Sequence, residues 1–228
     1  MSSRYNYKYL LFLVAIYISC FPLIQIGLHR PIVIGFFHLT SGAIIFPLTF
    51  ILTDIAAEVY GYQVARQIIW VHLPATLFYL SLLYVELHIQ PPQNWLHQSD
   101  YSYIFHGTTL IGLLGNLGVI IGFMVNIFAI SKWKILVRGK YFWLRSIGAS
   151  SIGELIQLTV GMLGALYLQL WPFNEWLNIF ISIYALRLLS AGILSIPATL
   201  IIIILKKLEG VDIYDYNTNF NPFKIAIQ

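Results

Sequence analysis

Six long stretches of this chain contain no Asp, Glu, Lys or Arg, and no other feature restricts its possible folds so strongly. Each stretch supplies about the 20 apolar residues that a helix needs to cross a hydrocarbon core of about 30 Å. Of the 228 residues, 59% are hydrophobic and only 10% are charged, which is more apolar surface than a soluble domain of this length can bury. The sequence therefore predicts an all-α integral membrane protein, a bundle of about six transmembrane helices. The predicted spans cover residues 9–28, 38–60, 67–88, 105–130, 146–169 and 178–205.

The basic residues are distributed unevenly between the two faces that six spans create. Arg30 falls on one face and Arg187 inside a span, whereas the others fall on the opposite face. Cytoplasmic loops carry the excess of Lys and Arg, so we predict that both termini are cytoplasmic. The rule also accounts for the net charge of +4, which we therefore do not attribute to nucleic-acid binding. The residues on the predicted cytoplasmic face are Arg4, Lys8, Arg66, Lys132, Lys134, Arg138, Lys140, Arg145, Lys206, Lys207 and Lys224.

Residues 1–228 are predicted to form a single polytopic transmembrane domain with a polar C-terminal tail at 209–228. No loop is long enough for a separate catalytic or nucleotide-binding module, and the sequence has no Walker-type glycine loop. Cys20, the single cysteine, cannot form an internal disulfide or a cysteine-based zinc site, and the six histidines show no zinc-ligand spacing. We therefore expect neither a metal nor another cofactor. Since no nucleophile or metal set is recognisable, we do not expect an enzyme.

Two acids in the second predicted span are expensive to place in a membrane. An ionisable side chain at the centre of a span costs about 2.5–3.5 kcal/mol. Asp54 and Glu58 lie four residues apart and share a helix face, where two carboxylates repel each other. Glu58 can be interfacial and pair with Arg66. For Asp54 two readings stay open, a structural bond between helices or a role in a binding site, and we favour the site.

The fifth and sixth spans add Glu154, Gln157 and Arg187. Glu154 and Gln157 lie close to one stripe of small and polar residues at helical spacing, which indicates either a packing seam or the lining of a polar cavity. Arg187 can neutralise Glu154 or Asp54 in the bundle interior, as a structural pair or as part of a site. Buried charges that face one another suggest transport of a small polar solute.

The fourth predicted span is rich in glycine. The sequence Gly118-xxx-Gly122 is a small-residue motif typical of close helix contacts, and we expect it to pack against a neighbouring helix. Asn116 on the same span is a further candidate for the polar cavity.

Three segments resemble a known family in this order and spacing. Residues 46–62 read FPLTFILTDIAAEVYGY, residues 142–157 read FWLRSIGASSIGELIQ, and residues 206–223 read KKLEGVDIYDYNTNFNPF. They resemble the queuosine precursor transporter family, also called the vitamin uptake transporter family. The resemblance covers nearly the whole chain from the second span to the tail, and the tail block is the most specific of the three.

This resemblance implies a six-helix importer, multi-pass in the bacterial inner membrane, for 7-cyano-7-deazaguanine or 7-aminomethyl-7-deazaguanine, which are salvaged to make the queuosine of tRNA. A guanine-like edge offers adjacent N–H donors that one carboxylate can accept, and flat bases stack on aromatic rings. Asp54 or Glu154 is then expected to read the edge, and Phe46, Phe50 or Trp143 to supply the stacking face. The full candidate set for solute binding is Asp54, Glu154, Gln157, Arg187, Asn116 and Phe50.

One departure from the family concerns Gln157, where the family tends to carry an aspartate. Gln157 can bond a base but carries neither charge nor proton, and we expect Glu154, one turn earlier, to compensate. Three alternatives stay open: the substrate-binding subunit of a multi-component vitamin importer with an ATPase partner, a transporter of another purine-like solute, and a structural assembly factor. The expected partners are a 7-deazapurine solute and membrane lipid, with a homo-oligomer also open.

Overall fold

The computed structural model describes residues 7–35, 37–167 and 172–224. Within them, six helices are long and apolar enough to cross a membrane, which confirms the predicted all-α membrane bundle. A short antiparallel hairpin of β1 and β2 separates the first two helices. The elements are α1 (Leu10–Gly27), β1 (Pro31–Ile34), β2 (Phe37–Thr40), α2 (Gly42–Tyr60), α3 (Tyr62–His88), α4 (Gln98–Leu136), α5 (Phe142–Tyr167) and α6 (Phe173–Glu209).

The hairpin corrects the start of the second predicted span. That span was expected to begin at residue 38, but residues 37–40 pair with residues 31–34, and α2 begins only at Gly42. The run of β-branched Ile and Val in β1 favours an extended strand, and Gly35 turns the chain with a positive φ of 58°. An apolar, charge-free segment is compatible with either structure, so hydrophobicity alone could not separate strand from helix.

Other helix ends also differ from the predicted spans. α3 begins at Tyr62 rather than residue 67, because Gly61 alone separates it from α2. α4 begins at Gln98 and extends to Leu136, beyond the predicted 105–130. α6 likewise exceeds 178–205 at both ends, and the predicted end of the fifth span at residue 169 falls outside the described residues.

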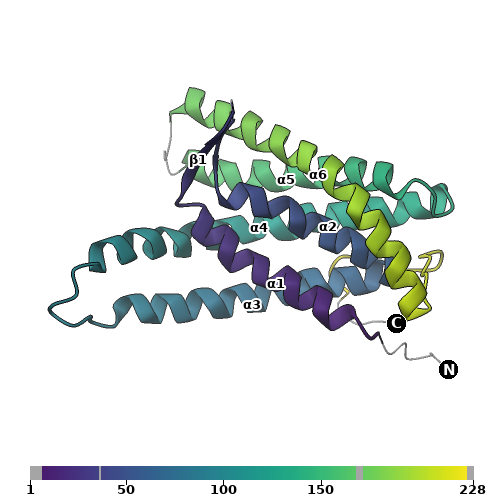
Figure 1. The fold of residues 1–228 in the computed structure, drawn as a ribbon, viewed down its shortest axis with the longest axis horizontal. Helices are drawn as coiled ribbons and strands as arrows, with labels where there is room; N and C mark the ends of the chain where they lie inside the picture. Colours follow the sequence, from purple (N-terminus) through teal and green to yellow (C-terminus); the bar gives the residue numbers. More distant parts are fainter. Residues whose placement is uncertain (1–6, 36, 168–171, 225–228) are drawn as a thin grey trace.

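The helices run roughly along one common direction (Figure 1). One end of the bundle holds the start of α1, the α2–α3 junction and the α4–α5 turn, together with the tail after α6; we call it the tail end. The other end holds the hairpin and the α3–α4 loop. α2 lies in the middle, packed against α1, α3, α4 and α6, and most of its residues are buried. A helix buried on nearly every side brings its polar residues into the bundle interior rather than toward lipid.

Glycines bring α4 and α5 into close contact, as expected for the Gly118-xxx-Gly122 motif. A Cβ atom on Gly122 would lie 2.5 Å from the carbonyl oxygen of Gly153 and 2.5 Å from the Cβ of Gln157. A Cβ on Gly118 would lie 2.8 Å from the carbonyl oxygen of Gln157. Only glycine permits this approach, which places the polar face of α5 directly beside α4.

The tail folds back over the bundle, and we call residues 211–224 the tail strap. The Asp215 carboxylate accepts a hydrogen bond from the backbone N–H of Tyr62 at 3.0 Å, at the buried N-terminus of α3. Arg66 donates to the carbonyl oxygens of Asn219 and Asn221 at 3.2 and 2.7 Å. The Trp70 indole donates to the carbonyl of Pro222 at 2.7 Å. The strap therefore fixes the tail end of α3.

Candidate solute-binding site

Four buried polar residues follow one face of α5, and we call them the polar stripe: Ser146, Ser150, Glu154 and Gln157. Their spacing of four, four and three residues keeps them on one side of the helix. This side faces the bundle interior, because Ser146 bonds to Asp54 of α2 and Gln157 bonds to Arg187 of α6. The stripe therefore joins three of the four ionisable positions that the sequence analysis singled out.

Asp54 occupies the end of the polar stripe nearest the tail end. Its side chain has no exposed surface. The Asn126 amide donates to one carboxylate oxygen at 2.6 Å, and the Ser146 hydroxyl donates to the other at 2.5 Å. In the described part of the chain, no cationic side chain forms an ion pair with Asp54. Two uncharged residues thus satisfy this carboxyl group.

Arg187 occupies the opposite end of the stripe. Its guanidinium donates to the side-chain oxygen of Gln157 and lies 3.9 Å from the centre of the Phe46 ring. The direct ion pair that the sequence suggested with Glu154 or Asp54 is not formed among the described residues, although the charges of Arg187 and Glu154 interact. Gln157 explains the difference, because it offers Arg187 an uncharged acceptor. The Nε of Arg187 is buried and has no hydrogen-bond partner within the described structure.

Glu154 lies between these two ends of the polar stripe, and its hydrogen bonding differs from that of Asp54 and of Arg187. Its side chain is fully buried, and neither carboxylate oxygen has a hydrogen-bond partner among the described residues. The Ser150 hydroxyl, one turn away, is buried and equally without a partner. A buried polar group without a partner costs about 1–3 kcal/mol, and more if it is charged. Each such group calls for an explanation, and one explanation is a water, ion or ligand that completes its hydrogen bonds.

Aromatic rings lie beside the stripe. Phe50 is almost completely buried, with its ring centre 4.1 Å from that of Phe123 and 5.9 Å from that of Phe46. A Cβ atom on Gly153 would lie 3.0 Å from the Phe50 ring, so this ring is next to the residue that precedes Glu154. A flat solute bonded to Glu154 would therefore have aromatic surface close by.

Asn116 belongs to a different polar group, which the sequence analysis missed. Its side-chain oxygen lies 2.9 Å from a ring nitrogen of His72 on α3, and the Thr76 hydroxyl lies 3.2 Å from the other. His72 also contacts the ring of Phe21, with centres 3.8 Å apart. The histidine within a charge-free span was the available signal, since a polar ring there requires partners.

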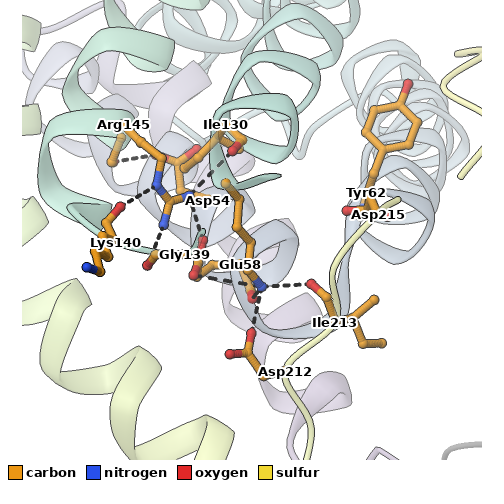
Figure 2. A network of polar contacts seen from close by, with 12 residues as sticks. Asp54, Glu58, Tyr62, Ile130, Gly139, Lys140, Arg145, Asp212, Ile213 and Asp215 are labelled. Atoms are coloured by element: carbon orange, nitrogen blue, oxygen red, sulfur yellow. Dashed lines mark hydrogen bonds and ion pairs between the residues drawn. The ribbon is translucent and has the colours of Figure 1, made fainter. Parts of the chain in front are cut away.

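A second charged group lies at the tail end and centres on Glu58 (Figure 2). Glu58 is 2% exposed and binds Arg145 and Lys206 at 2.8 Å each, with Lys134 at 3.8 Å. Asp212 of the tail strap binds Lys134 at 2.6 Å and Lys206 at 2.9 Å. We call these five residues the ionic cluster. The cluster connects α2, α4, α5, α6 and the strap.

The ionic cluster corrects the predicted pair of Glu58 with Arg66. Arg66 bonds to the strap, and the cations that reach Glu58 come from α4, α5 and α6. Proximity in sequence favoured Arg66, but the helix turn after Gly61 directs it to the tail instead. In the strap, burial acts to raise the pKa of Asp212, but hydrogen bonds from Lys134 and Lys206 outweigh it and hold that pKa below its ordinary value.

Comparisons with known proteins agree on a class of membrane transporter. Residues 40–202 match the model of a family described as "Putative vitamin uptake transporter". A protein of Bacillus subtilis (strain 168) is 24% identical over 159 residues, which are 69% of this chain and 69% of the relative. A protein of Haemophilus influenzae is 25% identical over 180 residues, which are 76% of this chain and 73% of the relative. Both bear the name "Probable queuosine precursor transporter". No solved structure matches the chain.

Proposed function

Because the chain belongs to the vitamin uptake transporter family and is a multi-pass bacterial membrane protein, we propose that it imports a queuosine precursor of the 7-deazaguanine class. The names of the two relatives support this solute. The observation that carries the proposal is the buried Glu154 carboxylate, neither oxygen of which has a hydrogen-bond partner among the described residues. It fits the adjacent N–H donors of a guanine-like edge, which two parallel hydrogen bonds can satisfy.

The neighbours of Glu154 supply the remaining contacts in this proposal. The Ser150 hydroxyl and the Nε of Arg187 offer unused hydrogen-bonding groups for the rest of the solute. Phe46 and Phe50 offer ring surface for its flat face, and Gln157 holds Arg187 in place. We do not include Asp54 among the residues that bind the solute, because Asn126 and Ser146 already donate hydrogen bonds to its two oxygens.

Selectivity follows from the cost of leaving Glu154 unpaired. A site built to bond the N–H groups of a solute rejects an analogue that lacks them by a large factor, because its own buried polar groups then stay unsatisfied. We therefore expect 7-deazaguanine compounds to bind far more tightly than 7-deazaadenine, whose edge does not offer the same pair of donors.

The test uses the purified protein in detergent and in vesicles. Binding of 7-cyano-7-deazaguanine and of 7-aminomethyl-7-deazaguanine is measured by calorimetry, and counterflow of labelled solute is measured in vesicles that contain only this chain. We expect binding and counterflow from the lone protein. Binding without counterflow would instead indicate the substrate-binding subunit of a multi-component importer. No binding of either deazaguanine would reject the proposed solute.

The matched variants are Glu154→Gln and Glu175→Gln. They make the same chemical change, one at the unpartnered buried acid and one at an exposed acid in the first turn of α6. We expect Glu154→Gln to weaken binding by about tenfold or more, as the loss of a charged hydrogen bond of about 1.5–3 kcal/mol requires. Glu175→Gln should bind like the wild type; equal binding by all three proteins would remove Glu154 from the site.

A further inference from the structure

We propose that Asp54 is the site of a coupling proton, so that this protein carries its solute inward together with H⁺. The inference rests on the proposed function, since it assigns the driving force for the same transport step. It stands on the contrast between three buried acids of one small region: Asp54, Glu58 and Glu154.

The three acids differ in what surrounds them. Glu58 binds cations from three helices, so its negative charge already has partners. Glu154 has no hydrogen-bond partner within the described structure. Asp54 has two partners, Asn126 and Ser146, and both are uncharged. A fully buried acid with neutral hydrogen-bond partners is stable without a charge, which is what a proton carrier requires.

The partners of Asp54 can serve both of its protonation states. A hydroxyl donates to a carboxylate and equally accepts from a carboxylic acid, so Ser146 fits both forms. Asn126 donates through its amide nitrogen, while its amide oxygen is buried and has no partner in the described structure. A half-turn of this amide would present an acceptor to protonated Asp54. The site therefore holds an unused acceptor where a proton carrier needs one.

Of the helices packed on α2, all except α1 carry charged residues. The charges that act on Asp54 belong to Glu154 and Arg145, both on α5. The others are engaged elsewhere: Lys134 of α4 and Lys206 of α6 with Glu58, Arg187 of α6 with Gln157, and Arg66 of α3 with the tail strap.

The interaction between Asp54 and Glu154 links the proton to the solute. Two carboxylates that share a region of low dielectric constant resist being charged together. A proton on Asp54 therefore favours the ionised form of Glu154, which accepts the N–H groups of the solute. By linkage, bound solute favours the proton on Asp54 to the same degree. In one cycle Asp54 takes a proton from the outer water and releases it to the inner water, so one proton moves inward with each solute molecule.

The experiment compares two activities of the protein in vesicles. Counterflow reports binding and movement of the solute without net proton transfer, whereas accumulation driven by an imposed pH gradient requires coupling. We expect wild-type protein to accumulate labelled 7-cyano-7-deazaguanine when the outside is more acidic, by up to about tenfold for each pH unit. A protonophore should abolish the accumulation, and addition of solute should acidify the vesicle interior.

The decisive variant is Asp54→Asn, with Asp100→Asn as the matched change at an exposed aspartate. Asp54→Asn should keep counterflow and lose accumulation above the external concentration, whereas Asp100→Asn should keep both. Asp54→Glu, which restores a titratable acid, should recover part of the accumulation. If Asp54→Asn is not monodisperse in detergent, Asp54→Ser replaces it as the neutral variant.

Three results would overturn the proposal, and they are distinguishable. Wild-type counterflow without any response to the pH gradient rejects proton coupling and leaves the proposed function intact. Gradient-driven accumulation by the neutral variants rejects Asp54 as the proton site. Absence of wild-type counterflow and binding rejects the proposed solute, and the inference fails with it.

Discussion

Glu58 and Glu154 show that the surroundings of a buried carboxyl group decide what its charge does. Both are almost fully buried, yet Glu58 binds three cations and Glu154 has no partner among the described residues. We predict that the same Glu→Gln substitution affects stability differently at the two positions. Glu58→Gln takes the acidic partner from buried Arg145 and leaves Lys134 and Lys206 with Asp212 alone, so it should destabilise the fold by about 3–5 kcal/mol. Glu154→Gln should be no less stable than the wild type.

Thermal unfolding of both variants in the same detergent measures this contrast, and solute binding is measured on the same samples. Glu154→Gln should separate the two properties, with full stability and weakened binding. A Glu154→Gln protein as unstable as Glu58→Gln would show that Glu154 has a structural partner.

At the level of the helices, close packing of α4 against α5 depends on glycine. A Cβ on Gly122 meets backbone and side-chain atoms of α5 at 2.5 Å, whereas a Cβ on Gly115 meets nothing within 4 Å in the part of the chain that the structure describes. We predict that Gly122→Ala destabilises the protein by about 1–3 kcal/mol, because α5 has to move away. It should also weaken solute binding, since the polar stripe moves with α5.

Gly115→Ala on the same helix is the control, and the lower backbone entropy of alanine should leave it neutral or more stable by about 0.5–1 kcal/mol. Thermal unfolding of both variants in one detergent gives the comparison. Equal stabilities would mean that α4 and α5 tolerate a wider separation than the structure shows.

The tail strap is an element that the ionic cluster attaches to the helices. Asp212 bonds to Lys134 and Lys206, and its pKa is lower in the attached strap than in a released one. Its contribution to attachment is therefore complete above the ordinary aspartate pKa of 3.8 and is lost as the pH falls through the lowered value. We predict that Asp212→Asn loosens the strap at neutral pH, seen as faster proteolysis of residues 211–224. Asp100→Asn, at an exposed site away from the strap, should not change the cleavage rate.

At the scale of the whole molecule, the tail strap and the α4–α5 turn lie at the same end of the bundle (Figure 1). This location and the positions of the basic residues indicate one topology. We predict that the tail end is cytoplasmic and the α3–α4 loop is external. In a Cys20→Ala background, an impermeant thiol reagent should label Gln93→Cys in intact cells and should not label Gly139→Cys or Thr218→Cys. All three should react after the membrane is permeabilised. Labelling of Gly139→Cys from outside would reverse the orientation.

Local sequence signals were sufficient for the membrane class and for the approximate positions of the helices. Charge-free length requires a nonpolar environment, and only a helix satisfies its own backbone there, so these features needed no knowledge of distant contacts. The same signals failed at residues 37–40, where an apolar run forms a strand, because hydrophobicity does not distinguish the two structures.

The residues that are costly in a membrane can also be recognised from the predicted spans alone: Asp54, Glu58, Glu154 and Arg187. Their partners, in contrast, depend on how the helices pack. Glu58 pairs with cations of α4, α5 and α6, Asp54 bonds to Asn126 and Ser146, and Arg187 bonds to Gln157. Glu154 has no hydrogen-bond partner among the described residues. The cost of burial depends on the type of side chain and on the span that contains it, so it can be recognised from the sequence. A partner depends on the rotation and separation of helices far apart in sequence, which are set by packing contacts such as Gly122 against Gly153.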